Sequence, residues 1–185
     1  MELVKSAEEF ARLKHLGQLR ENRITPYAKH LEDVVSELKS MGVIDEDILC
    51  TGWLHDTIED TNTDYDEIHE EFNKNIADYV ASVTKDTRLI KSKQKKAYIF
   101  QLKKSPWQAK IIKLADIIAN FKDLDNSGYN DTTQKNKVKN KIPYILAIKS
   151  GIHSNKTIPR LESAQLTLNE LLKKYGQKPI SFKIN

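Results

Sequence analysis

Ile-Ile-Lys-Leu-Ala-Asp-Ile-Ile-Ala-Asn-Phe, residues 111–121, is the stretch that decides the fold class of this chain. Its apolar residues would cover a helix on most sides, which predicts a helix in the centre of the protein rather than at its surface. Asp116 lies in the middle of the run, and a carboxylate in such a place requires a partner. The stretch therefore predicts a buried central helix that carries one paired or functional acid.

Amphipathic helices are predicted on both sides of this segment. With 6 Gly and 5 Pro in 185 residues the chain is poor in turn residues, and its Lys, Glu, Leu, Ile and Ala content favours helix. Ser6 and Glu9 form a capping-box pattern, and Asp45 and Asp64 are suited to cap later helices. We expect an all-α protein of one domain, with helices over about residues 6–19, 27–40, 45–59, 64–72, 76–83, 91–104, 106–121, 132–150 and 159–175.

The composition excludes several classes of protein. The chain has one cysteine, Cys50, which cannot form an internal disulfide, and no charged-then-apolar leader opens the sequence. No run approaches the roughly 18 consecutive apolar residues of a membrane span. We therefore expect a cytoplasmic protein without a membrane partner.

Charge is distributed unevenly along the chain, although the net charge is only +4. Residues 1–84 hold 8 Lys and Arg against 19 Asp and Glu, whereas residues 85–185 hold 22 against 7. Metal-binding carboxylates followed by phosphate-binding lysines would give this pattern, but so would two solvated faces, which are the commoner cause. We do not expect nucleic acid as a partner; salt-dependent retention on DNA would indicate one.

A set of polar residues lies in otherwise apolar helices. His55-Asp56 ends an apolar run, Asp116 interrupts another, and His30 lies one turn beyond Pro26. Burying these groups unpaired would be costly, and a divalent cation bound by them would remove the cost, as would a set of core hydrogen bonds. Two imidazoles and two carboxylates would leave positions of an octahedral ion open, which is typical of a catalytic metal site.

The residues around this set resemble a known family. The run Leu54-His55-Asp56-Thr57-Ile58-Glu59-Asp60-Thr61 looks like the LHDxxEDT signature of the HD-superfamily hydrolase domain of RelA/SpoT-type enzymes, which include stand-alone small alarmone hydrolases and the metazoan SpoT homologue. Further motifs of that family follow its order: HxxQxR at His15, Gln18 and Arg20, PYxxH at Pro26, Tyr27 and His30, VTK at residues 83–85, and KLADxxxN at Lys113, Asp116 and Asn120.

The resemblance implies a fold, a cofactor and a reaction. It implies one helical HD domain over residues 1–185, with the family region at about 6–150 and a C-terminal helical extension at 151–175. It implies one divalent ion, usually Mn²⁺, held by His30, His55, Asp56 and Asp116. The expected reaction is hydrolysis of the 3′-pyrophosphate of ppGpp or pppGpp, small-molecule nucleotides, to GDP or GTP and pyrophosphate.

Five further residues receive roles. Glu59 lies four residues after His55, so a continuous helix would turn it towards the metal, where it and Asp60 could take a proton from the attacking water; the alternative is a solvated helix end. Substrate-binding roles are expected for Arg20, Lys113 and Asn120, although a surface ion pair would equally explain Arg20 and a hydrogen bond to a metal ligand would explain Asn120.

Departures from the family pattern keep other substrates open. Leu31 replaces the proline that usually follows the first histidine, and Ile117 and Ala119 replace polar residues beside the expected nucleotide pocket. The alternatives are an HD phosphohydrolase acting on another nucleotide, such as the 2′-phosphate of NADPH, and a degenerate HD domain that only binds nucleotide. A complete ligand set argues against degeneracy. Nothing in the pattern specifies an oligomeric state.

Overall fold

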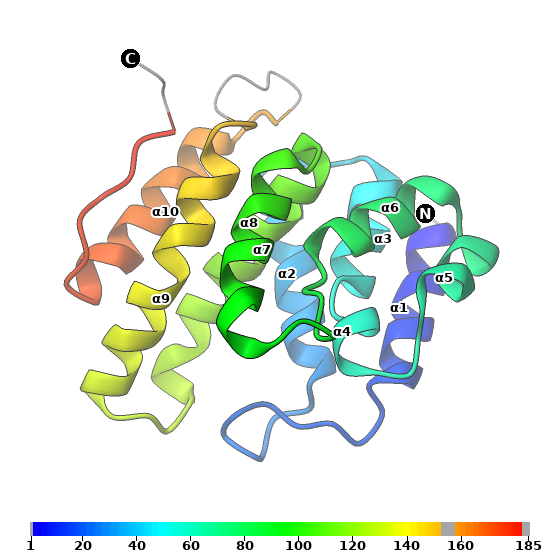
Figure 1. The fold of residues 1–185 in the computed structure, drawn as a ribbon, viewed down its shortest axis with the longest axis horizontal. Helices are drawn as coiled ribbons and strands as arrows, with labels where there is room; N and C mark the ends of the chain where they lie inside the picture. The colour runs from blue at the N-terminus through cyan, green and yellow to red at the C-terminus, as the bar shows by residue number, and fades with distance from the viewer. Residues whose placement is uncertain (1, 153–157, 183–185) are drawn as a thin grey trace.

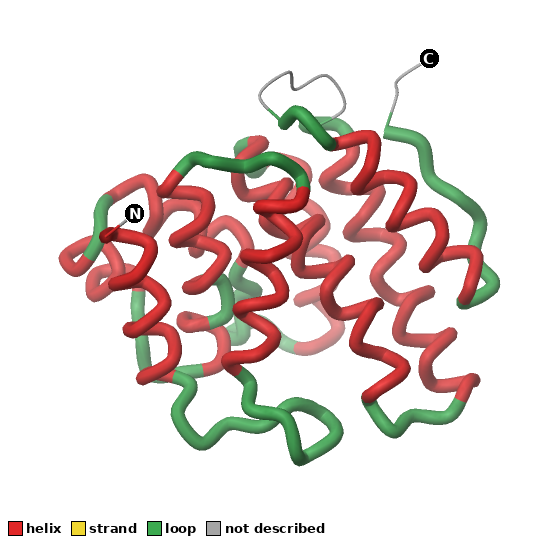
Figure 2. Tube along the Cα trace, turned by 180° about the vertical axis from the view of Figure 1, so that it is seen from behind, coloured by secondary structure: helices red, strands yellow, loops and turns green. Residues whose placement is uncertain are grey.

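The computed structural model describes residues 2–152 and 158–182, and helices are the regular elements of both ranges (Figures 1 and 2). The expected all-α class is therefore confirmed. Outside the helices the described residues hold an isolated β-bridge between Leu19 and Pro26. The elements are α1 (Glu2–Lys14), α2 (Ala28–Ser40), α3 (Glu46–Leu54), α4 (Thr57–Asp60), α5 (Tyr65–Glu71), α6 (Lys74–Val83), α7 (Lys91–Lys104), α8 (Trp107–Asp123), the 3-10 helix η1 (Leu124–Asn126), α9 (Asp131–Lys149) and α10 (Leu161–Lys174).

Helix α8 is the centre of the molecule, as its sequence predicts. It packs against α2, α3, α6, α9 and α10, with α1 and α5 towards one end of the molecule and α9 and α10 at the other (Figure 1). Residues 109–119 are all buried, because an apolar stretch in contact with helices on several sides has no face left for water. Asp116 is consequently held in the interior, where α2 and α3 can bring side chains to it.

The helix expected over residues 45–59 is interrupted. Asp45 caps its N-terminus by accepting a hydrogen bond from the Ile48 amide, as predicted, but α3 ends at Leu54 and α4 begins at Thr57. The expectation of one continuous helix was wrong because side chains compete for the last carbonyls: the Thr57 hydroxyl donates to Leu54 O at 2.6 Å. His55 and Asp56 form the junction between the two helices, with backbone angles that stay in the right-handed helical region.

The N-terminal helix also differs from expectation. It begins at Glu2 rather than Ser6, and the Ser6 hydroxyl donates to Glu2 O at 3.2 Å inside the helix, so the capping box does not form. It ends at Lys14, and Gly17, with a φ of 81°, turns the chain into the segment 15–27. This segment lies between α1 and α2 and brings Arg20 against the C-terminal half of α8.

The C-terminal region completes the packing around α8. Helix α9 runs through Pro143 without ending, and α10 falls within the extension expected over residues 151–175. Buried residues from Ala7 to Phe182 form one continuous apolar cluster. None of the described helices combines the length and apolar character required to cross a membrane.

Candidate metal centre and surrounding cavity

Four side chains from three parts of the fold converge beside α8. His30 lies in the first turn of α2, His55 and Asp56 occupy the break between α3 and α4, and Asp116 lies in the middle of α8. The Nε2 atom of His30 is 3.2 Å from Asp116 Oδ1 and 3.7 Å from Asp56 Oδ2. The Nε2 atom of His55 is 3.0 Å from Asp56 Oδ2 and 3.8 Å from Asp116 Oδ1. The structure thus brings together all four residues predicted as ligands.

The chemistry of this cluster fits a divalent cation. His55 Nδ1 lies 2.9 Å from Gly52 O, and in the tautomer that donates to this carbonyl, Nε2 carries a bare lone pair. That Nε2 atom is buried and has no hydrogen-bond partner within the described residues, although carboxylate oxygens face it. A lone pair facing carboxylates is repulsive unless a cation or a proton lies between them. Two imidazole nitrogens and two carboxylates form a donor set suited to first-row divalent metals.

Burial and charge act in opposite directions on the titration of the cluster. Burial lowers the pKa of His30 below its ordinary value. Burial also acts to lower the pKa of His55, but the carboxylates of Asp56 and Asp116 outweigh it and raise that pKa. For Asp116, burial favours the neutral acid, yet Lys113 and the histidines hold the pKa well below its ordinary value. The cluster is therefore a set of ionised carboxylates beside imidazoles.

Asp116 is positioned by two neighbours on its own helix. Lys113 Nζ lies 2.7 Å from Asp116 Oδ2, and both side chains are almost fully buried. Asn120 donates from Nδ2 to Asp116 O at 3.0 Å and to Asp116 Oδ1 at 2.5 Å. The hydrogen bond to a candidate ligand, one of the two explanations considered for Asn120, is therefore present, and Lys113 is committed to the same carboxylate.

Tyr27 links the cluster to the acids of α4. Its hydroxyl lies 2.5 Å from Asp56 Oδ2, to which it donates, and 3.2 Å from Asp60 Oδ2. Burial, together with the carboxylates of Asp56 and Asp60, raises the pKa of Tyr27 far above its ordinary value, so this hydroxyl remains a donor. Partial burial and the nearby carboxylates of Asp56 and Glu59 raise the pKa of Asp60.

His15 and Gln18 contact Tyr27 and α4. The His15 ring stacks on the Tyr27 ring with centroids 4.8 Å apart, and His15 Nδ1 lies 2.8 Å from Gln18 Oε1. Gln18 in turn donates from Nε2 to Asp60 O at 2.9 Å. The first two residues of the HxxQxR pattern therefore fix the geometry of Tyr27 and Asp60 and do not reach the metal cluster themselves.

Glu59 lies at the site but is held differently from the expectation. Glu59 lies on the short helix α4, beyond the break that follows α3, and not on one continuous helix with His55. Its carboxylate instead accepts from Lys85, with Nζ to Oε1 at 2.5 Å and the Lys85 amide to Oε2 at 3.2 Å. Lys85 is the lysine of the VTK segment, and this contact ties α4 to the end of α6.

The cluster opens into a cavity of about 250 Å³, here called the main cavity. A second cavity of about 220 Å³ continues from it towards the end of α8. The two share a wall made of Arg20, Glu21, Asn120 and Lys141. The remaining residues of the main cavity are Leu19, Tyr27, His30, Asp56, Glu59, Asp60, Lys85, Lys113 and Asp116.

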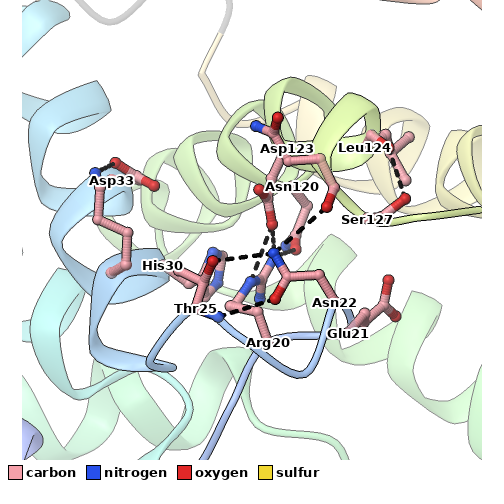
Figure 3. A network of polar contacts seen from close by, with 12 residues as sticks. Arg20, Glu21, Asn22, Thr25, His30, Asp33, Asn120, Asp123, Leu124 and Ser127 are labelled. Carbon is pink, nitrogen blue, oxygen red and sulfur yellow. Dashed lines mark hydrogen bonds and ion pairs between the residues drawn. The ribbon is translucent and has the colours of Figure 1, made fainter.

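Arg20 lines both cavities. It forms an ion pair with Asp123 at 3.0 Å and donates to Asn120 Oδ1 at 3.0 Å (Figure 3). Its guanidinium also lies 5.6 Å from the centre of the Tyr27 ring. Arg20, predicted to bind substrate, thus lines the expected pocket and is also paired with Asp123. The ion pair would hold its guanidinium in place before a nucleotide binds.

Some residues of the site were absent from the sequence-based predictions. Tyr27 was quoted within a motif but had no role, and Lys141 was not considered. A signal for Lys141 exists, since it lies three residues after the buried Val138 and four before the buried Ile145, on an otherwise apolar face. By contrast, the lysine-rich segment beyond Lys85 is mostly solvated: Arg88, Lys91, Lys93, Lys95 and Lys96 are exposed.

Comparison with known proteins identifies the class. The family model of the HD domain matches residues 7–153, and the chain belongs to this family. The resemblance to RelA/SpoT-type hydrolases drawn from the motifs is confirmed: the chain is 34% identical over 131 residues to guanosine-3′,5′-bis(diphosphate) 3′-pyrophosphohydrolase of Drosophila melanogaster, covering 70% of this chain and 73% of that protein. The corresponding protein of Homo sapiens is 37% identical over 121 residues, covering 64% and 68%.

A solved structure gives the same result for the fold. A structure described as a metazoan orthologue of SpoT that hydrolyses ppGpp and plays a role in starvation responses superposes with a TM-score of 0.80 at 27% identity. The match covers 95% of this chain and 97% of that one, so it includes the C-terminal helices as well as the family region. The expected HD-domain fold is confirmed.

Proposed function

We propose that this chain is a metal-dependent guanosine-3′,5′-bis(diphosphate) 3′-pyrophosphohydrolase, which converts ppGpp or pppGpp to GDP or GTP and pyrophosphate. One observation carries the proposal: His30, Asp56 and Asp116 of the four-residue cluster line a cavity whose walls also hold several cations, and His55 lies against Asp56. Acids for a metal and cations for phosphates in one cavity suit a polyphosphorylated substrate. The relatives from Drosophila melanogaster and Homo sapiens, both named as 3′-pyrophosphohydrolases, support the same assignment.

The four clustered residues would hold the metal, and we propose Mn²⁺. When bound, such an ion lowers the pKa of water towards ~7 and neutralises charge on a phosphate, which supplies a nucleophile near a polyanion. Glu59 and Asp60 lie on the cavity wall beside the cluster, where either carboxylate can accept the proton of the attacking water. Glu59 accepts hydrogen bonds from Lys85, and Asp60 accepts one from Tyr27, so both carboxylates are held at the cavity wall.

We propose that Arg20 and Asn120 contact the substrate directly, whereas Lys113 acts through Asp116. Arg20 and Asn120 line the wall shared by the two cavities, so they are placed to contact the nucleoside while the 3′-diphosphate lies at the metal cluster. Lys113 forms an ion pair with Asp116, and its positive charge offsets the negative charge of that buried carboxylate. In the reaction, water adds to the phosphorus next to the ribose, the bond from that phosphorus to the ribose 3′ oxygen breaks, and the oxygen takes a proton.

The experiment that tests this function is chromatography of early products from ppGpp, NADPH and simple nucleotides, with and without manganese. The proposal expects GDP and pyrophosphate in equal amounts from ppGpp and no early orthophosphate. Orthophosphate as the sole initial phosphate product, or no cleavage of ppGpp at any manganese concentration, would refute it. Release of orthophosphate from NADPH with formation of NADH would instead assign the alternative substrate named in the sequence analysis.

We also propose that residues 1–185 act as one catalytic domain located in the cytoplasm. The continuous apolar cluster from Ala7 to Phe182 supports a single cooperative unit, which calorimetric unfolding in one transition would verify. The one cysteine, Cys50, is a buried free thiol, as expected in a reducing compartment. Imaging of the tagged chain in cells tests the location.

A further inference from the structure

The cations that line the main cavity are not equivalent. Three of the four are engaged with carboxylates, whereas Lys141 has neither a hydrogen bond nor an ion pair within the described residues. Its ammonium lies 5.8 Å from the centre of the Tyr144 ring. The engaged pairs are Arg20 with Asp123 at 3.0 Å, Lys85 with Glu59 at 2.5 Å and Lys113 with Asp116 at 2.7 Å.

Lys141 occupies a particular place in the cavity system. It belongs to α9 and lines both the main cavity and the second cavity. Its helix position is on the inner face, near Val138 and Ile145, so its side chain is partly buried while its neighbour Lys139 is exposed. A bound molecule that extends from the metal cluster into the second cavity would pass it.

The surroundings of Lys141 do not favour its charge. Burial lowers its pKa, and the nearby charges of Lys113 and Lys85 act in the same direction. The carboxylates of Asp116 and Asp56 act in the opposite direction, but neither forms a hydrogen bond with the lysine. A partly buried ammonium without a direct partner costs stability, and a charged ligand would offset that cost.

We infer that Lys141 binds a phosphate group of the substrate at the junction of the two cavities, a specificity-determining contact that rests on the proposed function. A multiply phosphorylated nucleotide fits this place because one phosphate can lie at the metal cluster while another part of the molecule reaches the wall shared with Arg20 and Asn120. The free ammonium then gains the anionic partner that the protein does not provide. Lys141 contacts the ligand in this account and takes no part in proton transfer.

Binding of inorganic pyrophosphate to the manganese-loaded protein tests the inference, measured by isothermal titration calorimetry. The variants are Lys141→Met, which keeps an unbranched side chain, one atom shorter, without the charge, Lys141→Arg, which keeps the charge, and Lys139→Met as the control on the exposed side of the same helix. We expect Lys141→Met to weaken binding about 10- to 100-fold, Lys141→Arg to retain most of it, and Lys139→Met to bind as the parent does.

Two further measurements separate ligand binding from a structural role. In ppGpp hydrolysis, Lys141→Met should raise KM by a similar factor with a smaller change in kcat. Without ligand, its Tm should equal or exceed that of the parent, because an unpartnered charge has been removed from a partly buried place. A lower Tm together with unchanged pyrophosphate affinity would overturn the inference. If ppGpp is not cleaved but pyrophosphate binding still depends on Lys141, the proposed function fails and the phosphate contact stands.

Discussion

Removal of the Tyr27 hydroxyl by Tyr27→Phe is the perturbation that most directly tests how the candidate metal centre is held. The hydroxyl donates to Asp56 Oδ2 at 2.5 Å and lies 3.2 Å from Asp60 Oδ2, so the change takes a neutral donor from a proposed metal ligand. Phenylalanine retains the ring that stacks on His15, and the surrounding packing is therefore preserved. The effect should fall on the geometry of Asp56 rather than on the fold.

The magnitude follows from the hydrogen bond that is lost. A hydrogen bond to a charged group contributes about 1.5–3 kcal/mol, and each 1.4 kcal/mol changes an equilibrium constant about tenfold. Loss of a group that orients a metal ligand typically weakens metal binding by about 10- to 100-fold, which agrees with that range. We expect manganese affinity to fall by this factor in Tyr27→Phe, and kcat at saturating manganese to fall less.

Calorimetric titration of metal-depleted protein with Mn²⁺ measures the affinity directly. Tyr79→Phe is the matched control, because Tyr79 is also half-buried and its hydroxyl has no hydrogen bond within the described part of the chain. Affinity within twofold of the parent would show that the hydroxyl does not position Asp56. Tighter binding would equally refute the reasoning, since it would mean that the hydroxyl competes with the metal for the carboxylate.

Three other predictions concern the metal, the proposed base and the thiol. Manganese at about 100 times its Kd should stabilise the fold by about 2.7 kcal/mol, which corresponds to a rise of about 5–10 °C in Tm for a chain of this size. In a thermal scan of Asp116→Asn, addition of manganese should no longer raise the Tm, whatever the Tm of the metal-free variant is. Glu59→Gln should retain the metal by elemental analysis while kcat falls by about 10²-fold or more, because an amide cannot accept the proton of water; turnover within a few-fold of the parent would make Glu59 a surface acid. Burial raises the pKa of the Cys50 thiol to about 12, so iodoacetamide at pH 8 should modify it only on unfolding, and rapid labelling of the native protein, read by mass spectrometry, would contradict its burial.

Elements with a clear periodicity could be predicted from the sequence almost residue by residue. The lysine-rich helix was expected at 91–104 and α7 runs over Lys91–Lys104, because its local preferences and its packing agree. Asp45 and Asp64 cap their helices as predicted, since side-chain capping depends on residues within one turn. The break between α3 and α4 could not be read in the same way, because the apolar pattern continues through Ile58 while hydrogen bonds from His55 and Thr57 close the end of α3.

In the candidate site, too, residues within motifs could be predicted from the sequence, and contacts between distant segments could not. Residue types within motifs were sufficient to predict that His30, His55, Asp56 and Asp116 would lie together, which the structure bears out, and their role as ligands remains a proposal. The partners of the site depend on contacts between distant segments. The bond of Lys85 to Glu59 joins segments 26 residues apart, and no local spacing encodes it. The spacing of Lys141 from Val138 and Ile145 indicates an inner helix face, but which cavity that face lines depends on how α9 packs against α8.

The central position of α8 also has a consequence for the order in which the chain can fold. His30 and Asp116 are 86 residues apart in sequence, and Arg20 and Asp123 are separated by 103, so neither pair can meet until α2 and the segment 15–27 have docked on α8. An ion cannot then serve as an early nucleus, because its ligands are scattered in the unfolded chain. Metal capture would therefore be a late event in folding, after α2 and α3 have docked on α8 and brought the ligands together.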